Sequence, residues 1–220
     1  MSIELAGREV ELDGREVRVV GCLIEKELST PDYYPMTVNA LTAACNQKTN
    51  REPVVAYSES EVRDTLDQLQ RNRLVGSASS PHARTGKYRH ALAEMLDLAE
   101  SHLAILSSLM LRGPQTAGEL RSRTSRMHAF ESLEAVDAVL DELAARDPSL
   151  VAELPVRPGQ KEARFIHLFS GRDEIERELQ PTDARDDGGR IEELARDLDE
   201  LRESVSRLED ELRAFKKQFE

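Results

Sequence analysis

The sequence predicts a mainly α-helical protein with small β-hairpins, in which two tandem winged-helix domains precede a C-terminal coiled-coil helix. Three observations support this class. A pattern of three helices followed by a β-hairpin occurs twice, an unbroken heptad pattern closes the chain, and only 4% of residues are aromatic while 33% are charged. The expected parts are a first winged-helix domain (1–93), a second one (94–171), a flexible acidic linker (172–189) and a coiled-coil dimerisation helix (190–220).

The first domain begins with apolar residues spaced three and four apart between positions 15 and 28, which is typical of one helix face. Two prolines end this helix, and a shorter one is expected over 37–46. Ser58 and Glu61 form a capping box that starts a third helix, ending near residue 73. Strand patterns at 74–79 and 87–92 then predict the hairpin, or wing.

The second domain repeats this order with different residues. Helices are expected over 96–111, after the capping box of Thr116 and Glu119, and over 132–145, where Leu133 is among the inward residues. Strands are expected over 151–156 and 163–169. Because the residues differ, the repeat is one of architecture.

Several function classes find little support in the sequence. No apolar run approaches the roughly 20 residues of a membrane helix, so a cytoplasmic protein without membrane partners is expected. Cys22 and Cys45 lack CxxC spacing and sit among apolar residues, which indicates reduced core thiols. No catalytic motif or metal-ligand spacing appears, so we expect no enzyme and no cofactor.

The net charge of −12 is distributed unevenly along the chain. Residues 1–93 carry −1, residues 94–170 carry −4 and residues 171–220 carry −7. Phosphate neutralisation is the main source of non-specific affinity for nucleic acid. Any contact with double-stranded DNA is therefore expected to be weak, salt-sensitive and confined to the first domain.

Winged helices commonly place their third helix in the major groove and touch phosphates with the wing. The corresponding candidates for nucleic-acid binding are basic or amide residues of that helix and of the hairpin: Arg63, Gln68, Arg71, Arg84, Lys87 and Arg89. Acidic residues share the helix, and the hairpin charges also suit a solvated surface. In the second domain the third helix is strongly acidic and would be repelled by a duplex.

A polar run after the second helix is a candidate partner or phosphate loop, formed by Asn46, Gln47, Lys48, Asn50 and Arg51. It also suits a helix cap and turn. A second basic cluster ends the helix that Thr116 caps and consists of Arg121, Arg123, Arg126 and His128. It would contact phosphate or complement the helix end and nearby acids.

The stretches LIEKELSTPDYYPMTVNALTAACNQKTNREPVVAYSESEVRDTLDQL and LMLRGPQTAGELRSRT resemble the YceH family of uncharacterised bacterial proteins. The resemblance covers about residues 15–170. It implies tandem winged-helix domains in a bacterial cytosolic setting, with no established biochemical activity.

The C-terminal segment alternates apolar steps of three and four, which is the a/d pattern of a coiled coil. Its predicted dimerisation residues are Ile191, Leu194, Leu198, Leu201, Val205, Leu208, Leu212 and Phe215. The g-to-e′ charges favour a parallel homodimer, and an amphipathic helix folded back onto the domains is the alternative. The predicted function is a DNA-binding transcriptional regulator. The alternative is an adaptor that uses the winged helices as docking surfaces for an unidentified protein.

Overall fold

The computed structural model describes residues 3–5, 8–78, 86–156 and 159–170, all within one compact unit. These residues form seven α-helices: α1 (Gly14–Ser29), α2 (Val38–Cys45), α3 (Glu59–Arg71), α4 (Leu92–Leu96), α5 (Glu100–Arg112), α6 (Ala117–Thr124) and α7 (Leu133–Ala144). A short 3-10 helix, η1, spans Pro31–Tyr33.

The strands are short and all of their pairings are antiparallel. They are β1 (Ile3–Leu5), β2 (Arg8–Val10), β3 (Met36–Thr37), β4 (Val75–Ser77), β5 (Lys87–His90), β6 (Val151–Leu154) and β7 (Arg164–His167). They form the sheets β1-β2, β3-β5-β4 and β6-β7. The predicted class of helices with small antiparallel hairpins is confirmed at this level.

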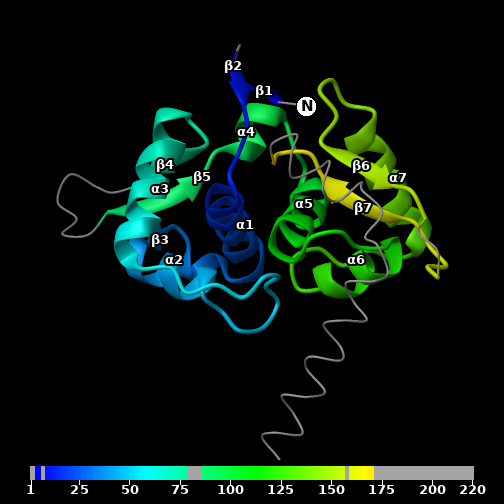
Figure 1. The fold of residues 1–220 in the computed structure, drawn as a ribbon, viewed down its shortest axis with the longest axis horizontal. Coiled ribbons are helices and arrows are strands. Elements are labelled where there is room, and N and C mark those ends of the chain that lie inside the picture. The colour runs from blue at the N-terminus through cyan, green and yellow to red at the C-terminus, as the bar shows by residue number, and fades with distance from the viewer. Residues whose placement is uncertain (1–2, 6–7, 79–85, 157–158, 171–220) are drawn as a thin grey trace, which may run out of the picture. The chain divides into compact units, whose positions relative to one another are not determined.

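Helices α1 and α5 pack side by side at the centre, with α2 and α3 beyond α1 and with α6 and α7 beyond α5 (Figure 1). The two central helices approach closely at Gly21. A Cβ atom at this position would lie 3.0 Å from Cβ of Met110 and 3.1 Å from Cγ of Leu111. The Ser107 hydroxyl also donates a hydrogen bond to the Gly21 carbonyl, at 3.0 Å. Gly21 therefore permits a contact that a side chain would obstruct.

Backbone hydrogen bonds join the two halves of the chain at two further places. The amide of Leu12 donates to the carbonyl of Phe169 at 2.9 Å, and the amide of Glu52 donates to the carbonyl of Leu111 at 2.8 Å. The first bond accompanies a parallel bridge between Leu12 and Ser170. The halves are thus connected by two backbone hydrogen bonds as well as by the packing of their central helices.

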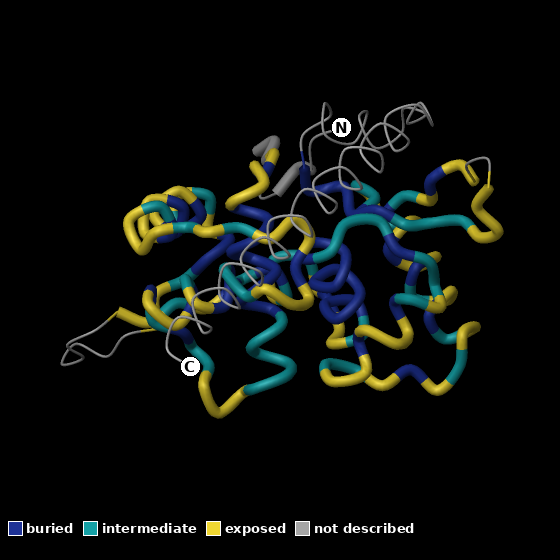
Figure 2. The backbone as a smooth tube through the Cα atoms, turned by 60° about the horizontal axis from the view of Figure 1, so that its bottom comes forward, coloured by how far each residue is buried: buried dark blue, intermediate teal, exposed yellow. Residues whose placement is uncertain are grey.

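The buried chain concentrates in α1 and α5 (Figure 2). The inward stripe of α3 (Val62, Leu66 and Leu69) is buried as predicted, and Cys22 and Cys45 are free thiols in the same core. Leu133 was expected in the core but is 43% exposed. It is the first residue of α7, where side chains tilt back towards the helix N-terminus, away from the buried residues Val136, Leu140 and Leu143 that follow.

Element boundaries depart from the sequence pattern at the junction of the halves. The helix expected over 96–111 is α5, which begins later, at Glu100, because Asp97 takes a left-handed conformation (φ 49°) and ends the preceding helix α4 at Leu96. Leu92, expected at a strand end, begins α4. The capping boxes at Ser58 and Thr116 both form as predicted.

Two matched substitutions test the close helix contact. Replacing Gly21 by Ala should lower the free energy of unfolding by about 1–2 kcal/mol, because overpacking outweighs the gain in helix propensity. Gly14→Ala in the same helix should be neutral or mildly stabilising, since no atom lies within 4 Å of a Cβ there. Urea denaturation measures both, and equal stabilisation by the two substitutions would contradict the close contact.

Candidate functional site

The outward face of α3 carries the predicted nucleic-acid residues. Arg63, Gln68 and Arg71 are all exposed, opposite the buried stripe of the helix. Arg71 donates a hydrogen bond to the Gln68 side chain. The exposed carboxylates of Asp64 and Asp67 lie on the same helix, so the face has mixed charge.

Acidic side chains at the start of α3 are engaged within the protein. The Glu61 carboxylate accepts hydrogen bonds from the backbone amide and hydroxyl of Ser58 and pairs with Arg15 at 3.0 Å. Glu59 accepts a hydrogen bond from Asn39 at 2.8 Å. Residues 68–73, at the other end, contain two arginines and no acid. The uncompensated positive charge therefore lies towards the C-terminal end of α3.

The hairpin after α3 places Lys87 and Arg89 on the exposed face of β5, the central strand of its sheet. Arg89 pairs with Glu94 at 2.5 Å, and this hydrogen bond and the carboxylate charge raise the pKa of the guanidinium above its usual value. Arg84 lies outside the described residues. The described hairpin thus offers exposed cations, one of which has an acidic neighbour.

The predicted phosphate loop divides into structural anchors and exposed residues. The amide side chain of Asn46 donates to the carbonyl of Tyr57 at 2.7 Å and accepts from its backbone amide at 2.8 Å. The buried Arg18 donates to the carbonyl of Pro53 at 2.6 Å. These bonds fix both ends of the segment between α2 and α3, while Lys48, Thr49 and Asn50 remain exposed.

Arg51 is the central anchor of this loop. Its side chain has no exposed area and binds both carboxylate oxygens of Glu25, at 3.1 and 2.6 Å. It also donates to the carbonyls of Ala44 and Asn50. A bidentate guanidinium–carboxylate pair that is also bonded to backbone carbonyls fixes loop geometry strongly. Arg51 therefore holds the loop against α1 and is not available to a ligand.

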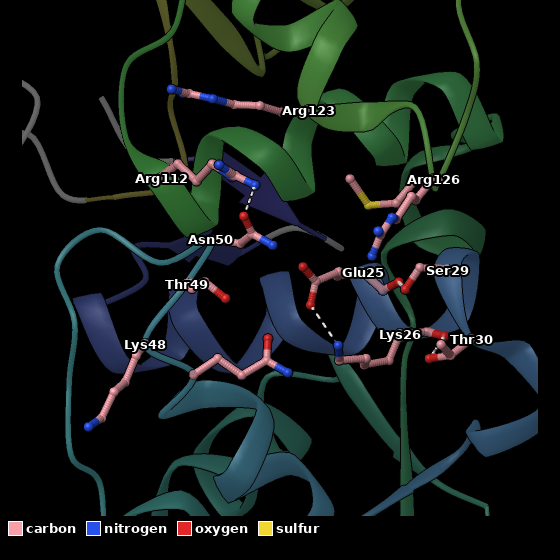
Figure 3. A pocket seen from close by; sticks show the side chains of 12 residues that line it. Glu25, Lys26, Ser29, Thr30, Lys48, Thr49, Asn50, Arg112, Arg123 and Arg126 are labelled. Carbon is pink, nitrogen blue, oxygen red and sulfur yellow. Dashed lines mark hydrogen bonds and ion pairs between the residues drawn. The ribbon is translucent and has the colours of Figure 1, made fainter.

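The exposed part of the loop faces the ends of α5 and α6 across a cavity of about 430 Å³. We name this cavity the basic pocket. Its charged lining residues are Glu25, Lys26, Lys48, Arg112, Arg123 and Arg126. Arg112 faces Asn50 and donates to its side-chain oxygen at 2.6 Å, and Arg126 reaches from the end of α6 towards α1 (Figure 3). The pocket therefore joins two sequence clusters that are more than 70 residues apart.

Positive charge in the basic pocket is only partly compensated. Burial raises the pKa of Glu25, but Arg51 and Lys26 outweigh this effect, so its pKa lies below the usual value and the carboxylate stays ionised. Burial and the neighbouring charge of Arg123 lower the pKa of Arg112. Neither Lys48 nor Arg126 forms a hydrogen bond or ion pair within the described part of the chain. The pocket is thus suited to an anion.

The remaining members of the second basic cluster have structural contacts. Arg121 donates to the carbonyls of Phe130 and Glu131, and His128 packs edge-on against Phe130 with the ring centroids 4.7 Å apart. Arg123 donates to the Gln115 side chain at 3.0 Å and lines the basic pocket. These contacts are intramolecular, and contact of the cluster with phosphate stays a prediction.

Sequence reasoning missed Lys26 and Arg112 as partners of the loop. Both lie in amphipathic helix patterns, where a basic residue is expected on the solvent side, so nothing in the sequence marked them as part of a site. The predicted dimerisation residues (Ile191, Leu194, Leu198, Leu201, Val205, Leu208, Leu212 and Phe215) lie outside the described residues, as do the linker and the rest of the tail.

The described residues offer neither a metal site nor a membrane span. Among the described residues, no group of three or more His, Cys, Asp or Glu side chains is placed to hold a metal ion. In the same residues, no helix has both the length and the apolar character needed to span a membrane.

Comparison with known proteins identifies the family. A family model described as "Protein of unknown function, DUF480" matches residues 12–160. A UPF0502 protein from Citrifermentans bemidjiense is 50% identical over 193 residues, covering 88% of this chain and 89% of that protein. A UPF0502 protein from Azoarcus sp. is 44% identical over 214 residues, covering 96% of this chain and 95% of that protein. The chain therefore belongs to the DUF480 family, also named UPF0502, of uncharacterised bacterial proteins.

Proposed function

We propose that the protein is a non-enzymatic, cytoplasmic DNA-binding regulator that contacts double-stranded DNA weakly through α3 and the β4–β5 hairpin. The observation that carries the proposal is the exposed face of α3. It presents Arg63, Gln68 and Arg71 outwards, while the acids at its first turn are engaged by Ser58, Arg15 and Asn39. Arginine and glutamine are suited to contacts with phosphates and base edges.

The order of elements supports a winged-helix fold in each half. In the first half, three helices precede the β4–β5 hairpin, and β3 extends that sheet. In the second half, α5, α6 and α7 precede the β6–β7 hairpin. In such a fold α3 is the recognition helix and the hairpin is the wing. The corresponding helix of the second half is α7. Its acids Glu134, Asp137, Asp141 and Glu142 are all exposed, as is Glu131 just before the helix. Duplex contact is therefore assigned to the first half alone.

We further propose that residues 190–220 form a parallel coiled coil, which makes the protein a homodimer. The heptad pattern supports this proposal. The match to the Azoarcus relative spans 96% of this chain, so the likeness extends into this segment. A dimer would present two copies of α3, and linked sites raise the apparent affinity when each contact is weak.

An adaptor role is the second candidate and has its own supporting observation. The acidic face of α7 lies beside the exposed Leu133, which lines a shallow hollow of about 480 Å³ with Phe130 and Ala129. An apolar side chain next to a strongly acidic surface suits a basic, partly apolar protein partner. If duplex binding is absent, this surface becomes the favoured site of action.

Charge reversal on α3 tests duplex binding. The affinity for mixed-sequence duplex DNA should fall steeply as salt increases, and Arg63→Glu should weaken it by about 5–20-fold at low salt through lost and repelled phosphate contact. Lys161→Glu, which changes the net charge equally in the second half, should have little effect. Fluorescence anisotropy at two salt concentrations measures both variants. Absence of binding at low salt, or equal effects of the two variants, would refute the assignment.

The double variant Arg84→Glu/Lys87→Glu tests the hairpin in the same assay. Its affinity for duplex DNA should fall further than that of Lys161→Glu, because a wing contacts the phosphate backbone beside the recognition helix. An unchanged affinity would remove the hairpin from the interface and leave α3 alone.

Sedimentation velocity tests the dimer. The full chain should sediment as a dimer and a chain truncated after Gly189 as a monomer, because the heptad residues would form the interface. A monomeric full chain, or a truncated chain that dimerises equally well, would show that the tail does not mediate association.

A further inference from the structure

We propose that the basic pocket is a binding site for a small polar ligand that carries a phosphate or diphosphate group. The inference is independent of DNA binding, because it rests on residues outside α3 and the hairpin. The relevant cations are Lys26 and Lys48 from the first half and Arg112, Arg123 and Arg126 from the second. The site therefore exists only where the two halves meet.

The charge balance of the pocket indicates an anion. Five cationic side chains line it, and Glu25 is the single carboxylate among its lining residues. That carboxylate already binds Arg51 at 2.6 Å and Lys26 at 3.2 Å. Arg126 has no partner among the described residues. The nearby charge of Arg123, which itself pairs with Glu119 at 3.7 Å, adds to burial in lowering the pKa of Arg112. A dianionic group would relieve this repulsion.

The pocket is held in shape before any ligand arrives. The buried Arg51 fixes the loop to α1, and the Asn46–Tyr57 bonds close its base. On the opposite wall, Gln115 is fully buried and its side-chain oxygen accepts a hydrogen bond from Arg123. A preformed site loses little conformational entropy on binding. The loop is thus a rigid wall and not merely a connection between helices.

The lining also restricts the class of ligand. Met127 is the single apolar residue among the twelve that line the pocket, and none of the twelve is aromatic. No surface is available for stacking a nucleobase, while the Gln47 amide and Thr49 hydroxyl offer neutral partners for ligand hydroxyls. A cavity of about 430 Å³ holds a compact phosphate ester or a diphosphate. A hollow between two halves also suits a small ligand better than a continuous nucleic-acid backbone.

Inorganic pyrophosphate is the probe for this site. Calorimetric titration of the full chain in a metal-free buffer of low ionic strength should show saturable binding, accompanied by a higher melting temperature. Arg126→Ala should weaken binding at least about tenfold, because a charge-assisted hydrogen bond is lost. Arg126→Lys should restore part of the affinity, since it keeps the charge but not the forked geometry.

Two controls separate pocket binding from general attraction. Lys161→Ala removes one positive charge from the exposed β6–β7 connection, and Arg63→Glu alters the proposed DNA surface. Both should leave pyrophosphate affinity within about twofold of the unchanged protein. Absence of saturable binding at millimolar pyrophosphate, or equal losses in Arg126→Ala and Lys161→Ala, would overturn the site. A loss of duplex affinity in Arg126→Ala without any pyrophosphate binding would also overturn it, in favour of a nucleic-acid contact.

Discussion

The close packing of α1 against α5 is the constraint on which the rest of the structure depends. At Gly21 the two helices meet without an intervening side chain, and the Ser107 hydroxyl bonds to the carbonyl exposed there. This contact places α1 and α5 at the centre of one core, and the remaining elements pack around them. The backbone bonds from Leu12 to Phe169 and from Glu52 to Leu111 then have fixed positions in which to form.

This arrangement turns a tandem sequence into one structural unit. Each half alone would expose the apolar side of α1 or α5, so their association buries surface that neither half can cover by itself. The same packing brings the loop after α2 to the ends of α5 and α6. Lys48 and Arg126 thereby line one cavity, although they belong to different halves. The basic pocket is a consequence of the helix packing and not of either half.

Local patterns predicted much of the fold because local physics decides it. The stripe of Val62, Leu66 and Leu69 and the Ser58 capping box determine α3 with only short-range information. Other features depend on backbone conformations that a pattern of apolar and polar residues does not predict. The two-residue strand β3 is too short for any period. The left-handed Asp97 ends α4, so the next helix begins at Glu100, later than its apolar pattern predicts.

The candidate sites divide in the same way. The exposed cations of α3 follow from the helix period, because residues opposite a buried stripe must face solvent. The role of Arg51 could not be predicted, since its partner Glu25 lies 26 positions away. A basic residue in a polar loop resembles a ligand contact until its carboxylate partner within the protein is known. Gly21 likewise resembles any glycine within a helix, and only the position of α5 explains it.

The packing of α1 against α5 predicts that the residues of both halves fold as one cooperative unit. The chain contains no tryptophan, so single substitutions Tyr57→Trp and Phe165→Trp would report separately on the first and second halves. In equilibrium urea unfolding of each variant, the tryptophan fluorescence and the circular dichroism should change together, with the same midpoint urea concentration. This should hold for the probe in either half. Two separate transitions, with one half retaining structure after the other has unfolded, would contradict the account.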